Sequence, residues 1–585
     1  MASLSNTVAS STVSPTSTFS ELPFYHPGRR VCLPPRRYSL RVSCSGGDEK
    51  QRKGEAGRID RRDVLIGLGG LYGVTSLGFA PTAAGAPITP PDLSKCGPAD
   101  LPAGAAPTNC CPPNLRNIVD FKLPNQRSPM RVRPAAHLVN DDYLAKYKKG
   151  VELMKALPAD DPRNFTQQAN VHCAYCDGAY DQIGFPDLEI QVHNSWLFFP
   201  WHRYYLYFFE RIIGKLINDE TFAIPFWNWD APGGMQLPAI YADRSSSLYD
   251  PMRDAKHQPP FMLDLDYNFV DPNIPNDEQI ASNLTIMYRQ MVSGAKTPQL
   301  FLGSAYRAGG QPNPGGGTVE GVPHGPVHIW TGDRTQPNTE NMGNFYSAAR
   351  DPIFFAHHAN IDRMWTVWKS LGGKRRDFTD PDWLNSGFLF YDENAQPVRV
   401  KVGDCLDSNK LRYRYQDVEI PWLTNRPTPL KAKANKAVAP RILSKREVNT
   451  TVTDFPVKLN KVVKVVVDRQ KKSRSKKEKE EEEEVLVIDG IEFDGDVAVK
   501  FDVLINLEDE TMGKPTATEF AGSFFHVPHK HGKKSNKIKT SLRLGITDLL
   551  EDLDADADDD VVVTLVPQIG KDVVTIGGIK IEYVS

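Results

Sequence analysis

The sequence has little of what marks several protein classes. It contains only 8 cysteines in 585 residues, too few to build the fold on disulfide bonds. Its 70 basic and 72 acidic residues nearly cancel, so the net charge does not favour a nucleic acid or an anionic membrane as partner. The apolar stretch 64–80 is short and holds five glycines, which argues against an integral membrane span. Small molecules are therefore the expected partners.

The first 86 residues have the composition of two successive targeting signals. Residues 1–60 begin with a segment that is rich in Ser, Thr and Arg and nearly free of acidic residues, as in an organelle transit peptide. Residues 61–86 open with Arg61-Arg62 and continue with a weakly apolar run, as in a twin-arginine export signal. Together they predict a plastid protein delivered to the chloroplast thylakoid lumen, with a mature chain from Pro87.

The mature chain up to residue 425 is predicted to be mainly α-helical. Helical periodicity with start or stop signals occurs in three places, namely between Asn140 and Pro158, after Pro200, and from Pro352 to Gly372. Residues 87–135 are rich in Pro, Ala and Asn, which predicts an irregular arm over the helices. Residues 230–320 are rich in Gly, Pro, Asn and Asp and predict long connections.

The composition changes twice after residue 425. Residues 426–450 are basic, contain Pro and lack large apolar groups, which predicts a protease-sensitive linker. Residues 451–585 contain β-branched runs of strand length, which predict a small β-sandwich-like domain. Within it we expect the charged block 471–484 to form a solvated hairpin loop. The segment HVPHKHG, with His526, His529 and His531, is expected to be a surface turn rather than a third metal site.

Seven of the 13 histidines lie in two compact sets. The first set is His172, His193 and His202, and the second is His324, His328, His357 and His358. A single histidine in an aromatic helix is more often a hydrogen-bonded core residue than a ligand. However, hardly any carboxylate accompanies these sets, which disfavours magnesium, calcium and manganese. The joint pattern favours two copper or zinc ions held by imidazole rings, since positions i and i+4 of a helix share a face.

The segment VHCAYC leaves several interpretations open. Cys173 and Cys176 have the spacing of a redox pair, and together with His172 they also fit a zinc site. Spacing alone does not decide between these possibilities and a less common arrangement.

Longer motifs are more specific. They are FFPWHRYYLYFFE, HGPVHIW, DPIFFAHHANIDRMW, the segment FTDPDWLNSGFLFYDENAQPVRVKVGDCLD, and VKFDV near the C-terminus. In this order they resemble the plant polyphenol oxidases, the catechol oxidase and tyrosinase group of type-3 copper proteins, over essentially the whole chain. The resemblance implies a helical-bundle dicopper domain with long loops over residues 87–425. It also implies that the domain over residues 451–585 covers the active site in a latent form.

The resemblance assigns six histidines to two copper ions. His172, His193 and His202 would bind one ion, CuA, and His324, His328 and His358 would bind the other, CuB. In the family pattern Asp-Pro-x-Phe-x-x-His-His the second histidine is the ligand, so His357 would support the site or border the substrate pocket. The copper ions would oxidise catechols to o-quinones with O2 as co-substrate, once a processing protease has acted at the linker.

The resemblance also suggests which residues adjust the substrate preference. Phe345 resembles a gate residue over the second copper, and Glu320 resembles an acid that holds a water and helps to deprotonate a phenol. Gly325 stands where hydroxylating relatives often carry Asn, and Ile329 adds apolar surface without a base. These residues favour the oxidation of diphenols over the hydroxylation of monophenols.

The cysteines receive separate roles from the same resemblance. Cys96 would pair with Cys111, and Cys110 with Cys173, so that two disulfide bonds tie the irregular arm to the helices. Cys176 would form a thioether bond to a ring carbon of His193.

Three other functions remain open at this point. A specialised hydroxylase of a lignan, a chalcone or another secondary metabolite would use the same site. A non-catalytic O2-binding protein would share the metal centre but not the turnover. A dinuclear zinc hydrolase usually has a carboxylate ligand or base, which the histidine sets lack. The sequence sets no oligomeric state.

Overall fold

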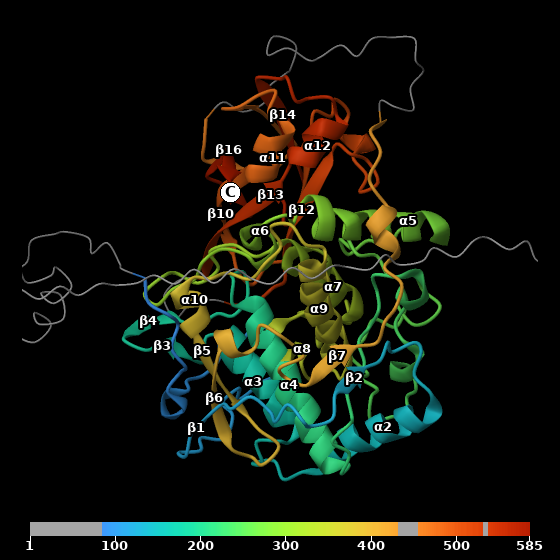
Figure 1. Ribbon diagram of the computed structural model, residues 1–585, viewed down its shortest axis with the longest axis vertical. Coiled ribbons are helices and arrows are strands. Elements are labelled where there is room, and N and C mark those ends of the chain that lie inside the picture. Colours follow the sequence, from blue (N-terminus) through green and yellow to red (C-terminus); the bar gives the residue numbers. More distant parts are fainter. Residues whose placement is uncertain (1–84, 431–453, 531–535) are drawn as a thin grey trace, which may run out of the picture. The chain divides into compact units, whose positions relative to one another are not determined.

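A computed structural model describes residues 85–430, 454–530 and 536–585 (Figure 1). Most of the predicted targeting signals, most of the predicted linker, and His531 lie outside these residues. Within the described part of the chain, no helix has both the length and the apolar character needed to cross a membrane.

Four long helices form the centre of the helical part. They are α2 (Asp141–Ala156), α3 (Phe165–Cys176), α4 (Phe198–Leu216) and α9 (Ile353–Ser370). The side chain of Asn140 caps α2 by accepting from the backbone N–H of Tyr143, and two aspartates in the first turn favour the positive helix end. The three predicted helices and the mainly helical class are therefore confirmed.

Helix α3 was not predicted from periodicity. It begins after Asn164, whose side chain accepts from the N–H of Thr166, and every residue from Gln168 to Cys176 is buried. A helix that is buried on all sides has no polar face, so the contrast on which periodicity depends is missing. Helix α3, which carries His172 and Cys176, therefore could not be predicted from its hydrophobic periodicity.

Short elements connect the long helices. The helices are α5 (Asn276–Tyr288), α6 (Pro298–Leu302), α7 (Gly325–Thr331), α8 (Phe345–Ala348) and α10 (Pro381–Asn385). The strands are β1 (Val119–Asp120), β2 (Arg131–Arg133), β3 (Asp181–Gln182), β4 (Phe185–Glu189), β5 (Gly387–Tyr391), β6 (Pro397–Lys401) and β7 (Tyr413–Tyr415). The irregular arm enters this framework through β1, which pairs with β6, and β2, which pairs with β7.

Two antiparallel sheets form the C-terminal β domain. Their strands are β8 (Val457–Lys458), β9 (Val463–Asp468), β10 (Glu483–Asp494), β11 (Val499–Ile505), β12 (Phe520–His526), β13 (Lys537–Gly545), β14 (Asp560–Ile569), β15 (Thr575–Ile576) and β16 (Gly578–Val584). One sheet has the order β13-β10-β15-β8, with β16 also on β10, and the other has β12-β11-β14-β9. Val463, Val465 and Val467 of β9 alternate with more exposed residues, so one face of each strand fills a shared core. The sandwich-like prediction is confirmed.

The expectation of a hairpin loop for the charged block was wrong, although none of the residues 476–481 is buried. Residues Lys476–Glu481 form helix α11, and Ser475 and Glu478 cap it reciprocally. No hairpin forms because β9 and β10 belong to different sheets. A second short helix, α12 (Thr547–Asp552), lies beside the start of β10.

The first residues of the predicted linker are also more ordered than expected of a linker. Thr428 pairs with Ala517 in a parallel bridge. Its N–H donates to the carbonyl of Thr516, and its own carbonyl accepts from the N–H of Thr518. The segment that leaves the helical part is therefore attached to the β domain before the chain leaves the described residues.

Candidate metal centre

Three elements position the first histidine set. His172 lies on α3, His193 lies in the loop between β4 and α4, and His202 lies in the second turn of α4. Each ring has its Nδ1 atom held: His172 by the carbonyl of Phe345 at 3.0 Å, and His202 by the carbonyl of Phe198 at 2.8 Å. The Nδ1 atom of His193 lies 3.1 Å from Oε1 of Gln191.

The second set comes from two neighbouring segments. His324 ends the π-helical segment η5 (Glu320–His324), His328 follows one turn later on α7, and His357 and His358 lie on α9. The Nδ1 atom of His324 is 2.9 Å from the carbonyl of Glu320, and that of His328 is 2.7 Å from the carbonyl of Met342. Cys176 also belongs to this region, since its sulfur and ring nitrogens of His172 and His193 lie within 4.8 Å of one another.

The two sets converge on one place. The rings of His202 and His358 stack with centroids 4.3 Å apart, His324 and His358 are 5.0 Å apart, and His193 and His202 are also 5.0 Å apart. All seven rings are at most 2% exposed. Two sequence-distant sets therefore share one closed centre.

The ring nitrogens that point inward have the chemistry of metal ligands. The Nε2 atoms of His172, His193, His202 and His324 are buried and have no hydrogen-bond partner. Nε2 of His328 faces Nε2 of His358 at 3.2 Å. Buried polar atoms normally have partners, so a group of such atoms with their opposite nitrogens held fits a bound cation.

The lowered pKa values of the buried histidines also agree with metal binding. Burial lowers the pKa of His172 to about 3 and that of His328 to about 4. Burial, together with the neighbouring histidines, also lowers the pKa of His193, His202 and His358 well below the ordinary value. Neutral imidazole is the form that binds a metal, so these rings are ready as ligands at neutral pH.

His357 differs from its neighbours. Its Nδ1 atom accepts a hydrogen bond from the indole N–H of Trp229 at 3.2 Å. A neutral imidazole has one acceptor nitrogen and one that carries hydrogen. Because Nδ1 of His357 is the acceptor, its Nε2 carries the hydrogen and does not offer a lone pair.

A small cavity adjoins the histidines. It is lined by His193, Asn194, Glu320, His324, Gly325, Phe345, Phe525, His526 and Val527. Glu320, Gly325 and Phe345 of the predicted substrate residues are thus brought together, whereas Ile329 is buried in α7 and does not line the cavity. Burial raises the pKa of Glu320 to about 8, although the N–H groups of Asn194 and Gly317 donate to its carboxyl group.

The β domain supplies residues that the sequence analysis missed. Phe525 and His526 line the cavity, and the ring of His529 stacks on Phe345 with centroids 4.4 Å apart. Phe345 in turn stacks on His193 at 4.0 Å. The expectation of a surface turn over HVPHKHG was therefore wrong, since His526 and His529 are at most 4% exposed. The aromatic pair Phe524-Phe525 just before this segment was the available signal.

The cysteines tie the arm to α3. Cys96 is bonded to Cys111, and Cys110 is bonded to Cys173. Cys176 is buried and outside any disulfide. The six residues of VHCAYC therefore hold one cysteine that anchors the arm and another that faces the histidines.

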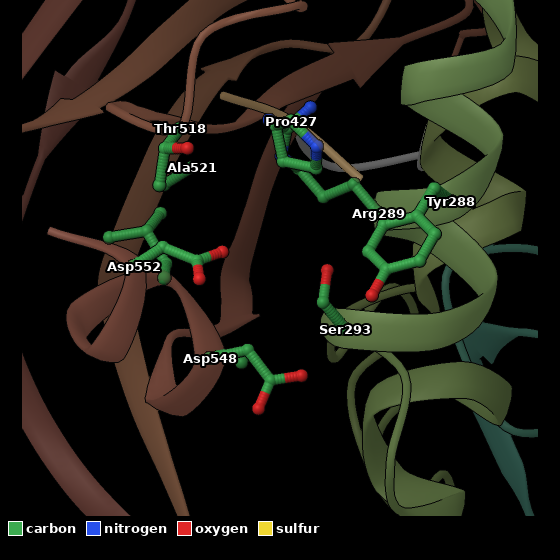
Figure 2. A pocket seen from close by; sticks show the side chains of 10 residues that line it. Tyr288, Arg289, Ser293, Pro427, Thr518, Ala521, Asp548 and Asp552 are labelled. Carbon is green, nitrogen blue, oxygen red and sulfur yellow. The ribbon is translucent and has the colours of Figure 1, made fainter. Parts of the chain in front are cut away.

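A second pocket lies apart from the histidines, where α5 and the segment η4 (Arg289–Ser293) meet the β domain. Figure 2 shows Tyr288, Arg289 and Ser293 on one side, and Thr518, Asp548 and Asp552 on the other. This second pocket contains none of the predicted site residues. It lies where the helical part contacts the β domain.

Comparisons with known proteins cover most of the chain. Residues 162–371 match the common central domain of tyrosinase, residues 377–428 match the polyphenol oxidase middle domain, and residues 455–583 match the chloroplastic polyphenol oxidase C-terminal domain. A chloroplastic polyphenol oxidase of Malus domestica is 59% identical over all of both chains. Aureusidin synthase of Antirrhinum majus is 58% identical over 88% of this chain and 92% of its own. The solved structure of latent apple tyrosinase is 62% identical, with a TM-score of 0.75 over 80% of this chain and 100% of its own.

Proposed function

The chain belongs to the plant polyphenol oxidase family, and from this premise we propose that it oxidises catechols to o-quinones while O2 is reduced to water. The observation that carries the proposal is the closed group of neutral imidazoles with inward-facing, unpartnered nitrogens. The adjoining cavity gives a planar ring access to them when the β domain is displaced. Monophenol hydroxylation is expected to be slower than catechol oxidation.

Six histidines would hold two copper ions. His172, His193 and His202 would bind CuA, and His324, His328 and His358 would bind CuB. When bound, the two ions would supply the electron exchange by which two catechols and one O2 yield two o-quinones and two waters, with all four electrons and all four protons coming from the catechols. The chain itself contributes the ring orientation, the exclusion of water and a wall of aromatic side chains. The tautomer of His357 supports its role as a neighbour rather than a ligand.

The cavity residues would orient the phenol. The ring of Phe345 forms one wall, and the missing side chain at Gly325 leaves space beside His324. The carboxyl group of Glu320 lines the cavity and accepts from the N–H groups of Asn194 and Gly317, so it would hold a water near the site and help to deprotonate a bound phenol. Glu320→Gln should lower the rate of tyramine hydroxylation by about 10²-fold and that of catechol oxidation by less, and equal losses would contradict this role. Ile329 would contribute only packing.

A thioether bond would join Cys176 to a ring carbon of His193. Its formation removes one hydrogen from sulfur and one from the ring, and both electrons and both protons pass to O2, giving hydrogen peroxide. The sulfur of Cys176 lies within 4.8 Å of a ring nitrogen of His193, and this proximity supports the proposal. Fixing the ring limits how far the metal geometry must change between oxidation states.

The β domain would keep the enzyme latent. Phe525, His526 and His529 occupy the side of the cavity from which a substrate would enter. Removal or displacement of this domain, after a protease has cut the linker, should expose the cavity. Equal turnover of catechol with and without the β domain would contradict this mechanism.

Substrate profiling tests the main proposal. The copper-loaded protein, freed of its β domain, should contain two copper ions per chain and oxidise 4-methylcatechol rapidly. Tyramine and tyrosine should react slowly or after a lag. Hydroxylation of tyramine as fast as the oxidation of 4-methylcatechol would overturn the preference for diphenols. O2 binding without turnover would favour a carrier, and bound zinc with hydrolytic activity would overturn copper chemistry.

A specialised hydroxylase is the second candidate. Relatives named aureusidin synthase and (+)-larreatricin hydroxylase support this candidate. The substrate panel should therefore include secondary metabolites such as chalcones and lignans. A chalcone that is converted faster than simple catechols would favour this candidate.

The location and processing follow from the same family membership. Relatives named as chloroplastic indicate a plastid protein. The thylakoid lumen is our extension, based on the twin-arginine signal over residues 61–86, with residues 1–60 as transit peptide. We assign residues 87–425 to the catalytic domain, 426–450 to the linker and 451–585 to the covering domain.

A further inference from the structure

We propose that Gln191 is a positioning residue that fixes the ring of His193 and holds it against Cys176. The inference rests on the proposed copper site and concerns a side chain that touches neither metal nor substrate. Gln191 is 1% exposed and lies two residues before His193 in the loop that connects β4 to α4.

The carboxamide of Gln191 connects the two partners of the predicted thioether bond. Its Oε1 atom accepts from the backbone N–H groups of Val192 and His193, both at 2.9 Å, and from Nδ1 of His193 at 3.1 Å. Its Nε2 atom donates to the carbonyl of Cys176 at 2.9 Å. One rigid planar group thus contacts both residues.

The location of His193 explains why a side chain is needed. His202 and His324 direct Nδ1 to the carbonyl four residues earlier, which helical geometry places within reach. His172 and His328 use backbone carbonyls of other segments. His193 lies in a loop and has no such carbonyl, so the amide oxygen of Gln191 takes this role. Among the six assigned ligands, it is the one whose Nδ1 is held by a side chain.

Two consequences follow for the site. Because Nδ1 of His193 donates its hydrogen to Gln191, the lone pair remains on Nε2, where a metal would bind. Cys176 is the last residue of α3, and its carbonyl belongs to the helix end that lacks intrahelical partners. The donated N–H from Gln191 satisfies this carbonyl and ties the end of α3 to the loop of His193.

The test compares three variants of the copper-loaded full chain. Gln191→Met keeps the volume but removes both the acceptor and the donor. Gln191→Glu keeps the acceptor oxygens and removes the donor to Cys176. Gln182→Met is the matched control, because Gln182 is also buried and its amide makes comparable bonds to Glu189, Tyr306 and Gly310 but touches no histidine.

The readouts are copper affinity and the cross-linked fraction. The cross-link lowers the mass of the joined Cys176 and His193 peptides by two hydrogen atoms, and any remaining free thiol can be alkylated. Gln191→Met should weaken binding of one copper ion by about 10- to 100-fold and leave most of Cys176 alkylatable. Gln191→Glu should bind copper within about threefold of the parent protein but form the cross-link more slowly. Gln182→Met should match the parent in both.

Each result decides something. Parental copper affinity and cross-linking in Gln191→Met would overturn the inference while leaving the proposed function intact. A parent protein that binds no copper would instead overturn the proposed function, and one that binds copper without the cross-link would overturn only the proposed thioether bond. If Gln191→Met does not fold, the test depends on the rate at which Gln191→Glu forms the cross-link. A rate equal to that of the parent protein would overturn the role of Gln191 at Cys176.

Discussion

At the scale of single residues, the absence of a side chain at position 325 couples the substrate cavity to its cover. A Cβ atom on Gly325 would lie 2.5 Å from Cδ1 of Phe525, far inside normal contact distance. Phe525 is 6% exposed and belongs to β12, so its ring has little room to move. The absence of a side chain at Gly325 therefore allows Phe525 of the β domain to pack against α7, in addition to leaving space for a substrate.

We expect Gly325→Ala to reduce latency. Overpacking a buried contact costs about 1–3 kcal/mol, which would raise the open fraction of the uncleaved protein by roughly 5- to 150-fold. Catechol oxidation by the full chain, measured without detergent or protease, should rise accordingly. Phe525→Ala is the control background, since the added methyl group then meets no ring and should cause little further activation. An equal rise in both backgrounds would contradict the contact as the cause.

At the scale of elements, a buried ionic network joins α4, α9, β2 and β7. Asp362 of α9 accepts from Nε of Arg203 at 2.5 Å, from Arg133 at 3.2 Å and from the hydroxyl of Tyr413 at 2.6 Å. Arg133 also pairs with Glu210 of α4 at 2.8 Å. Helices α4 and α9 carry His202 and His358, so this network fixes the spacing of the two histidine sets.

We expect Asp362→Asn to destabilise the fold by about 3–5 kcal/mol at neutral pH, because it leaves two buried arginines short of a counter-charge. Burial alone would raise the pKa of Asp362, but Arg203 and Arg133 outweigh it and hold the pKa below its ordinary value. The carboxylate therefore stabilises the folded state above the ordinary pKa of aspartate and loses this effect as the pH falls through the lowered value.

Chemical unfolding of the parent protein and of Asp362→Asn at pH 7 and in acid checks this expectation. The two free energies of unfolding should differ less in acid than at pH 7. An equal difference at both pH values would contradict the ionic explanation. Glu152→Gln is the control, since its pair with Lys149 is largely exposed and should matter much less.

The same elements indicate what a sequence can and cannot reveal. Helix α2 follows from Asn140 and its amphipathic pattern, and α9 follows from its periodicity and the glycines after it. Helix α3 leaves no such pattern because all its sides are buried. The candidate histidine ligands were identified through motifs, whereas the contacts of Gln191 with Cys176 and of His529 with Phe345 join separate segments. Local sequence carries information on local structure, and those contacts depend on how the segments assemble.

At the scale of the whole molecule, the β domain is held by contacts that do not pass through the linker. Lys500 lies 3.0 Å from both Asp266 of the helical part and Asp502 of its own strand, and it is buried. Arg289 donates to the carbonyls of Pro515 and Ala517, both at 3.0 Å (Figure 2 shows Arg289 beside Pro427 and across the pocket from Thr518). These contacts join residues on both sides of the segment 431–453 and remain when that segment is cut.

We therefore expect a single cut within residues 431–453 to leave the protein latent. The two fragments should co-elute in size-exclusion chromatography, and catechol oxidation should stay at the level of the intact chain until a detergent or mild denaturant separates them.

Lys500→Met should weaken the association, because it leaves Asp266 and Asp502 buried without their cation, a loss of about 3–5 kcal/mol. In the cut protein this variant should release the β domain and raise activity without detergent. Lys148→Met, which removes a surface cation paired with Asp243, serves as the control and should stay latent. Separation of the parent fragments and full activity upon cutting alone would show that the linker, not the interface, holds the cover in place.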